Sequence, residues 1–454
     1  MKIKLTSLLL PAVLISPSIM AATKQPNIVV FFVDDFGYND LGFRNPSFVT
    51  PNIDSFAKSN INFTAAYVPS PTSSPSRAGL LTGQHPLRMG LTRHISEYPK
   101  DINNGSDYEL WDDDPGRKYN IKQLTLDKRT FATALKEYGY TTYHVGKWHL
   151  GRTPYYPDKH GFDSMVGQSD LGGVYSFFPP YYENVKADYS GEYLTDMLTR
   201  RAVEAIDKHD YSTHPMLMYF AHYATHAPYV AKQAIVDKYK AQGISNTYAI
   251  YHAMVESMDS SFGAVIRSLK DKGVYDNTIV IFASDQGGNF DNSPLKGGKN
   301  DWPLHEGGAR VPLFVHYPGC TSPRQIDQRV STMDLYPTFI ELASSRPCRE
   351  KGLDGVSLAP TLKGGLPKER PLLFYRSYDN QFASVIDRNM KYIITRDGKD
   401  IVYDLIQDPG EKTNLFGDPK YAAQQKRLKK IVDSFLSKYD KTMYAKQGAK
   451  LTSK

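Results

Sequence analysis

The sequence predicts an α/β protein: a large domain with a mostly parallel, mixed sheet between helices, then a small α+β domain with an antiparallel sheet. Apolar runs of strand length alternate with helical periodicity over the first two thirds of the chain, as in a parallel sheet covered by helices. After about residue 350, short strand-like runs follow one another instead. A length of 454 residues is enough for both domains.

Four apolar runs are the predicted strands of the large sheet. Residues 27–35 (NIVVFFVDD) are apolar on both faces, which is typical of a central parallel strand. The other runs are residues 141–146 (TTYHVG), 216–222 (MLMYFAH) and 277–285 (NTIVIFASD). Ligands of such sheets bind beyond the carboxyl ends of the strands, so the polar residues that follow these runs are candidates for a site.

Helical periodicity marks the segments between these strands. Thr50 occupies the N-cap position and Pro51 the first position of a helix predicted over residues 50–59. Two further helices are expected over residues 131–138 and 250–270, where apolar residues recur at helical spacing.

The small domain is predicted from short strands and a basic helix. The strands are residues 371–377, 383–387, 391–396 and 401–405, the helix spans about 422–439, and a frayed tail is expected over 445–454. A turn-rich connection precedes them. We therefore expect a large domain over residues 23–365 and a small one over 366–454.

The N-terminus predicts export from the cytoplasm. Residues 1–22 carry Lys2 and Lys4 and then an apolar run, as in a secretory signal peptide, and no later segment is apolar enough to span a membrane. Cys320 and Cys348 could form one disulfide in an oxidising compartment, but the sequence leaves their pairing open. The formal charge of +7 is not gathered in a patch that would bind nucleic acid.

Residues 69–83 (PSPTSSPSRAGLLTG) place serines and an arginine just before a predicted helix. Pro71 and Pro75 are expected to keep the backbone extended there. Because helix N-termini bind anions, Ser73 and Arg77 suggest an anion site with a possible nucleophile. The alternative, a capped loop without chemistry, remains open on this stretch alone.

Oxygen donors follow two of the predicted strands. Asp34 and Asp35 come after the first, and Asp285 and Gln286 after the last. Carboxylate and amide oxygens without cysteine suit Ca²⁺ or Mg²⁺ and not a structural zinc. The alternative for each pair is a solvated turn, which becomes less attractive because the pairs follow two strands of one sheet.

Basic residues follow the other strands. Lys147 and His149 are two residues apart, so in an extended segment their side chains share a face and could hold an anion and move a proton. His226 precedes Ala-Pro, which disfavours a position inside a helix. Lys299 lies in a glycine-rich loop that permits close backbone approach. Taken singly, each has an ordinary alternative as a packed histidine or a solvated lysine.

Taken together, these motifs resemble those of the formylglycine-dependent sulfatases, members of the alkaline-phosphatase-like superfamily. The signature appears here in its serine form, Ser73-Ser74-Pro75-Ser76-Arg77 followed by AGLLTG. The similarity extends in the same order over most of the chain, through NIVVFFVDDFG, TPNID, FTAAYV, GYTTYHVGKWHLG, HAPY, SDQGG, EGGARVP, DLYPTF, LDGVSL and YDLIQDPGEKTNL.

The resemblance implies a mechanism. A maturation enzyme would oxidise Ser73 to formylglycine, whose hydrate attacks the sulfur of a sulfate ester. One Ca²⁺, with Mg²⁺ the less favoured ion, would be held by Asp34, Asp35, modified Ser73, Asp285 and Gln286. Arg77 would stabilise the diol at the helix start. Lys147, His226 and Lys299 would bind the sulfate oxygens, with His226 also the general acid, and His149 would help to regenerate the aldehyde.

Two positions depart from the family pattern. Gln286 stands where Asn or His is more usual, although it is still an oxygen donor. Ser73 stands where Cys is commoner, which implies either a serine-competent maturation enzyme or a replaced cysteine. For a natural sequence, the resemblance favours a bacterial periplasmic protein, with secretion as the alternative.

The expected substrate is a sulfated carbohydrate of carrageenan or ulvan type, with glycosaminoglycan fragments second. Aromatic residues of segment 155–193, Tyr181 and Tyr182 among them, are expected to line a groove for sugar rings, with packing beneath a loop as the alternative. Residues 93–120 are a second candidate wall, in which residues 112–114 are expected to be a solvated turn. Two other functions remain open: a phosphonate or phosphodiester hydrolase of the same superfamily, and a silent sulfoglycan-binding protein.

Overall fold

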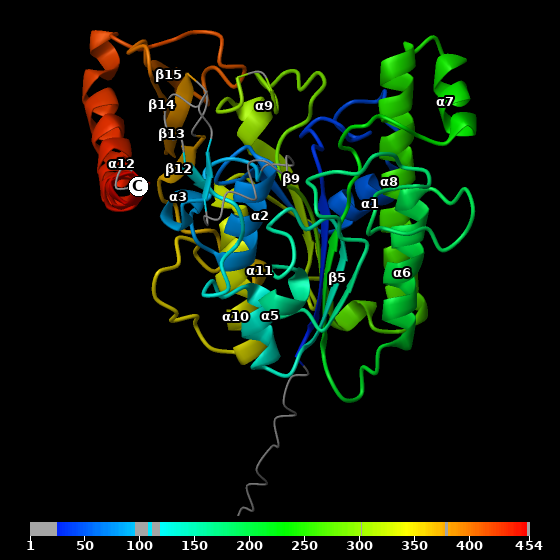
Figure 1. Ribbon diagram of the computed structural model, residues 1–454. Helices are drawn as coiled ribbons and strands as arrows, with labels where there is room; N and C mark the ends of the chain where they lie inside the picture. The colour runs from blue at the N-terminus through cyan, green and yellow to red at the C-terminus, as the bar shows by residue number, and fades with distance from the viewer. Residues whose placement is uncertain (1–24, 96–107, 111–118, 301, 377–379, 452–454) are drawn as a thin grey trace, which may run out of the picture.

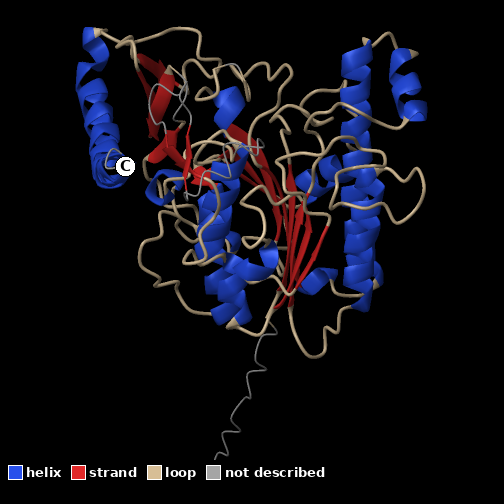
Figure 2. Ribbon diagram, viewed as in Figure 1, coloured by secondary structure: helices blue, strands red, loops and turns tan. Residues whose placement is uncertain are grey.

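The computed structural model describes residues 25–95, 108–110, 119–300, 302–376 and 380–451. Figures 1 and 2 show a central sheet between two layers of helices, with a smaller sheet and a long C-terminal helix beside it. The predicted signal peptide and residues 112–114 lie outside the described residues. Within them, no helix has both the length and the apolar character needed to cross a membrane.

The central sheet has nine strands among the described residues, in the order β10-β2-β9-β8-β1-β7-β5-β6, with β11 paired to β2. The strands are β1 (Asn27–Val33), β2 (Ile61–Tyr67), β5 (Thr141–Gly146), β6 (Ser164–Val166), β7 (Met216–Ala221), β8 (Thr278–Ser284), β9 (Arg310–His316), β10 (Arg324–Ile326) and β11 (Val330–Ser331). Their pairings are parallel except those of β9 with β2 and β8, so the predicted mixed, mostly parallel sheet is confirmed. The four predicted strands are the adjacent strands β8, β1, β7 and β5.

Helices cover both faces of this sheet because its strands are apolar on both sides. Along β1, Val30 and its alternate neighbours pack with α2, α5 and α10, whereas Phe31 and its neighbours pack with α1, α6 and α8 (Figure 1). The helices are α1 (Pro51–Ser59), α2 (Ser73–Thr82), α3 (Pro86–Met89), α5 (Phe131–Lys136), α6 (Leu194–Lys208), α7 (Gln233–Lys240), α8 (Asn246–Asp271), α9 (Glu306–Ala309), α10 (Leu335–Ser344) and α11 (Ala359–Leu362). The three predicted helices of this domain, α1, α5 and α8, are confirmed.

The start of α1 differs from the expected capping. Thr50 is the N-cap residue, but its hydroxyl donates to the Asp54 carboxylate at 2.7 Å instead of accepting from the helix. The carboxylate of Asp259, on α8, accepts from the backbone N–H groups of Asn52 at 3.3 Å and Ile53 at 2.8 Å. A residue 206 positions beyond Ile53 in the sequence therefore caps this helix.

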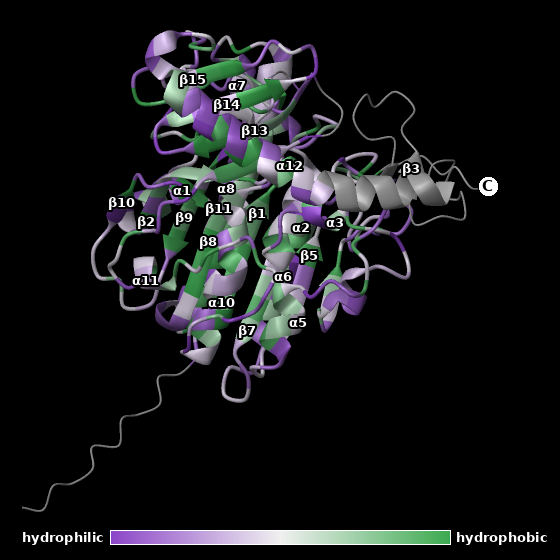
Figure 3. Cartoon of the chain, turned by 90° about the vertical axis from the view of Figure 1, so that its left-hand side faces the viewer, coloured by the Kyte–Doolittle hydropathy of each residue, from purple (hydrophilic) through white to green (hydrophobic). Residues whose placement is uncertain are grey.

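The small C-terminal unit has the predicted antiparallel sheet, with the order β12 (Leu372–Tyr375), β13 (Gln381–Asp387), β14 (Met390–Thr395) and β15 (Ile401–Asp404). Helix α12 (Ala422–Leu451) packs on it through Leu428 and Val432, and the part that faces the viewer in Figure 3 is hydrophilic. The expected fraying from residue 445 is wrong, because the helix continues to Leu451. Helix formers such as Ala, Lys and Gln fill that stretch, and it contains no proline.

The remaining described elements are short. They are β3 (Tyr108–Leu110) paired with β4 (Tyr119–Ile121), and the 3₁₀ turns η1 (Pro157–His160), η2 (Tyr275–Asn277), η3 (Thr332–Asp334) and η4 (Pro419–Tyr421). Cys320 and Cys348 are both half-buried free thiols, so the disulfide that the sequence left open is not formed in this structure.

Candidate active site

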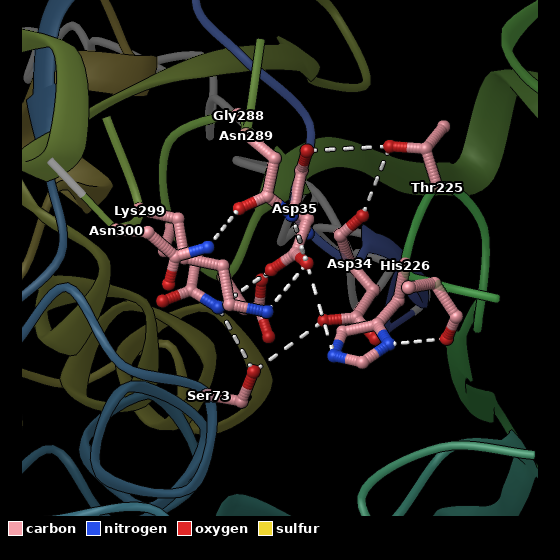
Figure 4. A network of polar contacts seen from close by, with 12 residues as sticks. Asp34, Asp35, Ser73, Thr225, His226, Gly288, Asn289, Lys299 and Asn300 are labelled. Atoms are coloured by element: carbon pink, nitrogen blue, oxygen red, sulfur yellow. Dashed lines mark hydrogen bonds and ion pairs between the residues drawn. The ribbon is translucent and has the colours of Figure 1, made fainter. Parts of the chain in front are cut away.

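Polar residues converge where four adjacent strands of the central sheet end. Asp34 and Asp35 follow β1, Lys147 follows β5, His226 follows β7, and Asp285 follows β8. Helix α2 begins beside them, and Figure 4 shows Ser73 near Asp34 with Lys299 and His226 around them. The structure thus brings together the residues that the sequence placed at strand ends.

Ser73 is the first residue of α2, a helix whose ten residues are all buried. Its hydroxyl donates to Oδ1 of Asp34 at 3.4 Å and accepts from Nε2 of Gln286 at 3.0 Å. The predicted serine and arginine at a helix start are confirmed. Pro75, however, is helical and not extended, because a proline in the first turn interrupts no i→i−4 hydrogen bond.

Three buried carboxylates stand together at the centre of the site. Ligand oxygens of Asp34, Asp35 and Asp285 lie within 4.8 Å of one another. Burial, together with the negative charge of Asp34, raises the pKa of Asp285. Burial, the largest single influence, acts to raise the pKa values of the other two, but the surrounding positive charges together outweigh it and lower them, with Lys147 foremost for Asp34 and Lys299 foremost for Asp35.

Each carboxylate is paired with a cation. Nζ of Lys147 lies 2.6 Å from Asp34, and Nζ of Lys299 lies 2.5 Å from Asp35. Arg77 donates from Nε at 3.1 Å and from Nη2 at 2.9 Å to one oxygen of Asp285. The three carboxylates and the three cations therefore balance in charge.

The donor set fits a hard divalent cation. Nε2 of Gln286 donates to Asp35 at 2.6 Å, while its Oε1 is buried and has no hydrogen-bond partner among the described residues. Because a half-turn of the amide exchanges its oxygen and nitrogen, Oε1 can take the place of Nε2, which now faces Asp35 and Ser73, and become a ligand for a cation. Three carboxylates, an amide oxygen and the Ser73 oxygen are the ligand types that Ca²⁺ and Mg²⁺ take.

The two predicted histidines lie in different surroundings. His226 is in the turn after β7, as expected from Ala-Pro, and its side chain is a quarter exposed. Its Nε2 is 3.8 Å from the Asp35 carboxylate and its Nδ1 is 2.6 Å from the carbonyl oxygen of Ala227.

His149 is fully enclosed. Its Nε2 lies 3.1 Å from the carbonyl oxygen of Ile95, and its Nδ1 has no partner among the described residues. Burial, followed by the charge of Lys147, holds the imidazole pKa well below its usual value. Lys147 and His149 follow β5 instead of continuing it, so their side chains do not share one partner. Lys147 contacts Asp34, whereas His149 forms its hydrogen bond with the backbone of Ile95.

Several neighbours of the site were not predicted from the sequence. Asn289 donates to the Asp35 carboxylate at 3.0 Å, and Asn300 in turn donates to Asn289 at 2.8 Å (Figure 4). Thr225 donates to the backbone carbonyl oxygen of Asp35 at 3.2 Å. The position of Asn289, four residues after Asp285 in a glycine-rich loop, is the one signal that would have found it.

His94 and Arg376 were also missed. Burial, and then the charges of cations that include Arg376 and Lys299, lower the pKa of His94 to about 3, so its imidazole is neutral. Arg376, at the end of β12, donates to the carbonyl oxygens of Lys299 at 2.7 Å and Pro71 at 3.3 Å. Nothing in the sequence around Arg376 distinguished it from a surface arginine.

The expectation that Tyr181 and Tyr182 line a groove is wrong. Both are buried, and the hydroxyl of Tyr181 donates to the carbonyl oxygen of Glu192 at 2.6 Å. They belong to the apolar core beneath the loop, which was the alternative interpretation. In the same segment, Tyr175 and Tyr189 are the exposed tyrosines.

Comparison with protein families agrees with this geometry. A family model described as Sulfatase matches residues 26–345. The chain belongs to the sulfatase family. A second model, described as N-sulphoglucosamine sulphohydrolase, C-terminal, matches residues 301–438 of this sulfatase. The resemblance recognised in the sequence is confirmed at this level, and the protein is a sulfuric ester hydrolase.

Relatives and solved structures extend the comparison. Human N-acetylgalactosamine-6-sulfatase is 30% identical over 90% of this sulfatase and 85% of the human protein, and human arylsulfatase A is 29% identical over 88% and 85%. A crystal structure of Ps i-CgsB in complex with k-i-k-neocarrahexaose superposes with a TM-score of 0.75 at 30% identity, over 88% of this chain and 90% of that one. The phosphonate monoester hydrolase of Agrobacterium radiobacter, at 20% identity, 91% and 96% coverage and a TM-score of 0.64, shares the fold.

Proposed function

We propose that this sulfatase hydrolyses O-sulfate esters of a sulfated carbohydrate, using a formylglycine made from Ser73 and one Ca²⁺. The observation that carries the proposal is the position of the Ser73 hydroxyl, which is hydrogen-bonded to both Asp34 and Gln286 at the start of a buried helix. The carbohydrates in the names of a relative and of a structural neighbour support the substrate class.

The proposed ion is held by the three carboxylates, Gln286 and the modified side chain of residue 73. The unpartnered Oε1 of Gln286 supports this assignment. When bound, such an ion polarises the sulfate ester and favours the anionic form of a nearby oxygen nucleophile. Ca²⁺ is proposed over Mg²⁺ because it tolerates several protein oxygens in irregular geometry.

Lys147 and Lys299 bind the sulfate group, and Arg77 stabilises the hydrated side chain of residue 73. Arg77 and Lys147 are fully buried, and the side chain of Lys299 is one-fifth exposed. Their positive charges are fixed by ion pairs before any substrate arrives. Charge that is preorganised in this way stabilises negative charge that develops in the transition state, without the cost of reorienting water.

The two histidines move different protons. Nδ1–H of His226 donates to Ala227, so the acid that protonates the departing alkoxide oxygen is the imidazolium form, which carries a second proton on Nε2 and gives that one up. His149 donates from Nε2 to Ile95, so its unpartnered Nδ1 is the atom that takes up a proton when sulfate is released. The lowered pKa of His149 keeps this atom unprotonated beforehand.

Location, maturation and domain division complete the proposal. Export through residues 1–22 delivers the protein to a bacterial periplasm, after a serine-competent maturation enzyme has acted on Ser73. Residues 23–365 form the catalytic domain and residues 366–454 the C-terminal one. Carrageenan or ulvan fragments are the first proposed substrates, supported by the neocarrahexaose in the neighbouring structure, and glycosaminoglycan fragments are second.

The decisive experiment is the mass of the tryptic peptide Ser59–Arg77 from protein made in its own host. A mass lower by two hydrogen atoms at Ser73 is expected, together with sulfate release from a panel of sulfated oligosaccharides. The Ser73→Ala variant is the control and should release none.

Other outcomes would support a different function. An unmodified serine from the native host would leave the site without its nucleophile and favour a silent sulfoglycan-binding protein. Faster turnover of an aryl phosphodiester than of an aryl sulfate would favour a phosphonate or phosphodiester hydrolase.

A further inference from the structure

Trp302 is an exposed aromatic residue on the loop that supplies Lys299. This loop connects β8 with α9, and the side chain of Trp302 is 48% exposed. Trp148, by contrast, is 1% exposed. Indole is among the largest apolar surfaces that a side chain offers, so a half-exposed tryptophan provides a flat apolar face to a ligand.

The backbone of Trp302 is held in an unfavourable conformation. Its φ is +50°, in the left-handed region that bulky residues rarely adopt. Asp35 and His149, both in the candidate active site, share this conformation, as do Ser345, Arg388 and Glu411 elsewhere. The surrounding structure must offset the strain at each of these positions.

The indole ring is held in place by its neighbours. Nζ of Lys296 lies 5.5 Å from the ring centroid, and the ring of His305 meets it edge-on at 5.6 Å. Lys296 is itself fixed by the hydroxyl of Tyr403 and the carbonyl oxygen of Glu411, each at 3.1 Å. The exposed aromatic surface is therefore preorganised, which lowers the entropic cost of binding a ligand.

Trp302 lies on the loop that reaches the sulfate site. Nζ of Lys299 contacts Asp35 at 2.5 Å, and the Cα atoms of Lys299 and Trp302, three residues apart, lie at most about 11 Å from each other. A disaccharide is of that length. Trp302 is therefore within reach of a sugar that extends beyond the sulfated carbon.

We propose that Trp302 is an aromatic platform for a sugar ring of the carbohydrate substrate, an inference that rests on the proposed function. The faces of a pyranose carry C–H groups, which pack favourably on indole. The ammonium groups of Lys296 and Lys299 on the same loop suit the negative charge of a sulfated saccharide. The platform acts on binding and selectivity, and it takes no part in breaking the ester bond.

Kinetics of three variants test this platform. Trp302→Ala should lower kcat/KM for a sulfated oligosaccharide by about tenfold, as expected when one ring face of apolar contact is lost. Trp302→Phe should retain most of the activity. Phe416→Ala is the matched control, because Phe416 is a comparably exposed aromatic residue at 45%. Inhibition by inorganic sulfate should be the same in all three, since sulfate contacts only the anion site.

Binding without turnover gives a second readout. In a Ser73→Ala background, the sulfated oligosaccharide should change the tryptophan emission in a saturable manner, and adding Trp302→Phe should remove most of that change. An unchanged emission titration, or equal kcat/KM for Trp302→Ala and wild type, would overturn the platform.

Two further results distinguish loss of the platform from a disturbed loop and from a mistaken substrate class. Parallel loss of oligosaccharide turnover and sulfate inhibition in Trp302→Ala would show that the loop is disturbed, and this would also overturn the platform. A wild-type enzyme that releases sulfate from none of the carbohydrates would instead contradict the proposed function itself.

Discussion

The guanidinium group of Arg376, in the C-terminal sheet, donates a hydrogen bond of 2.7 Å to the main-chain oxygen of Lys299. The ammonium group of Lys299 lies 2.5 Å from Asp35, at the centre of the site. Arg376 also donates to Pro71, two residues before Ser73. One buried side chain of the C-terminal unit thus joins the segment that precedes Ser73 to the loop that carries Lys299.

Replacing Arg376 should therefore lower activity, although Arg376 does not touch the substrate. Loss of hydrogen bonds from a charged donor costs about 1.5–3 kcal/mol each, so Arg376→Gln should reduce kcat/KM by about tenfold or more. Arg376→Lys should recover part of the loss, and Lys399→Gln, an exposed cation of the same domain, should have no effect. Steady-state kinetics on an aryl sulfate would show this, and wild-type values for Arg376→Gln would refute the positioning role.

Gln286 should contribute to metal affinity although it departs from the family pattern. Because its Oε1 is a buried, unpartnered oxygen, Gln286→Ala should weaken Ca²⁺ binding by about tenfold or more. Asn300→Ala is the control, since Asn300 reaches Asp35 only through Asn289. Calorimetric titration of the chelator-treated proteins measures the Ca²⁺ affinity of each variant. Equal Ca²⁺ affinity in Gln286→Ala and wild type would remove Gln286 from the ligand set.

Removal of the ion should destabilise the folded protein. The three carboxylates, whose oxygens lie within 4.8 Å of one another, bind the ion only in the folded protein, so Ca²⁺ at one hundred times its Kd should add about 2.7 kcal/mol to the free energy of unfolding. Thermal denaturation after chelation, and again after adding Ca²⁺ or Mg²⁺, should show a larger recovery of Tm with Ca²⁺. Equal recovery with both ions would contradict the assignment of calcium.

The titration of Glu411 should make the free energy of unfolding depend on pH. Glu411 lies 2.9 Å from Nζ of Lys391, which is 3.1 Å from Glu306, and all three side chains are buried. Burial, followed by the charge of Lys391 acting in the opposite direction, leaves the pKa of Glu411 raised to about 7. The folded state then keeps a proton that the unfolded chain releases near pH 4.5, so this contribution is complete at low pH and is lost as pH rises through 7.

The Glu411→Gln variant tests the direction of this pH dependence. Its free energy of unfolding should rise relative to wild type between pH 5 and 7, by up to about 1.4 kcal/mol per pH unit. Urea unfolding at several pH values measures the difference, and the exposed Glu369→Gln serves as the control. A pH-independent difference between Glu411→Gln and wild type would disprove the raised pKa.

The sheet around β1 was predictable because its strands are buried on both faces. Such strands read as apolar runs, as in β1, β7 and β8, whereas β5 has two threonines and a histidine. Strand β2 was missed because it mixes polar with apolar residues, and β9 because it contains Pro312, which is unusual inside a sheet. The capping of α1 by Asp259 was missed as well, because no local pattern announces a partner 206 residues away.

The sequence by itself determined which residues follow the buried strands, and parallel strands end at one edge of a sheet. That geometric rule is enough to bring Asp34, Asp35, Asp285 and Lys147 to one place. Tertiary structure alone decided which carboxylate pairs with which cation, the burial of Tyr181, the exposure of Trp302 and the reach of Arg376. These features depend on how the loops and the C-terminal unit pack. Contacts between residues far apart in the sequence produce no periodic pattern that could be recognised in the chain.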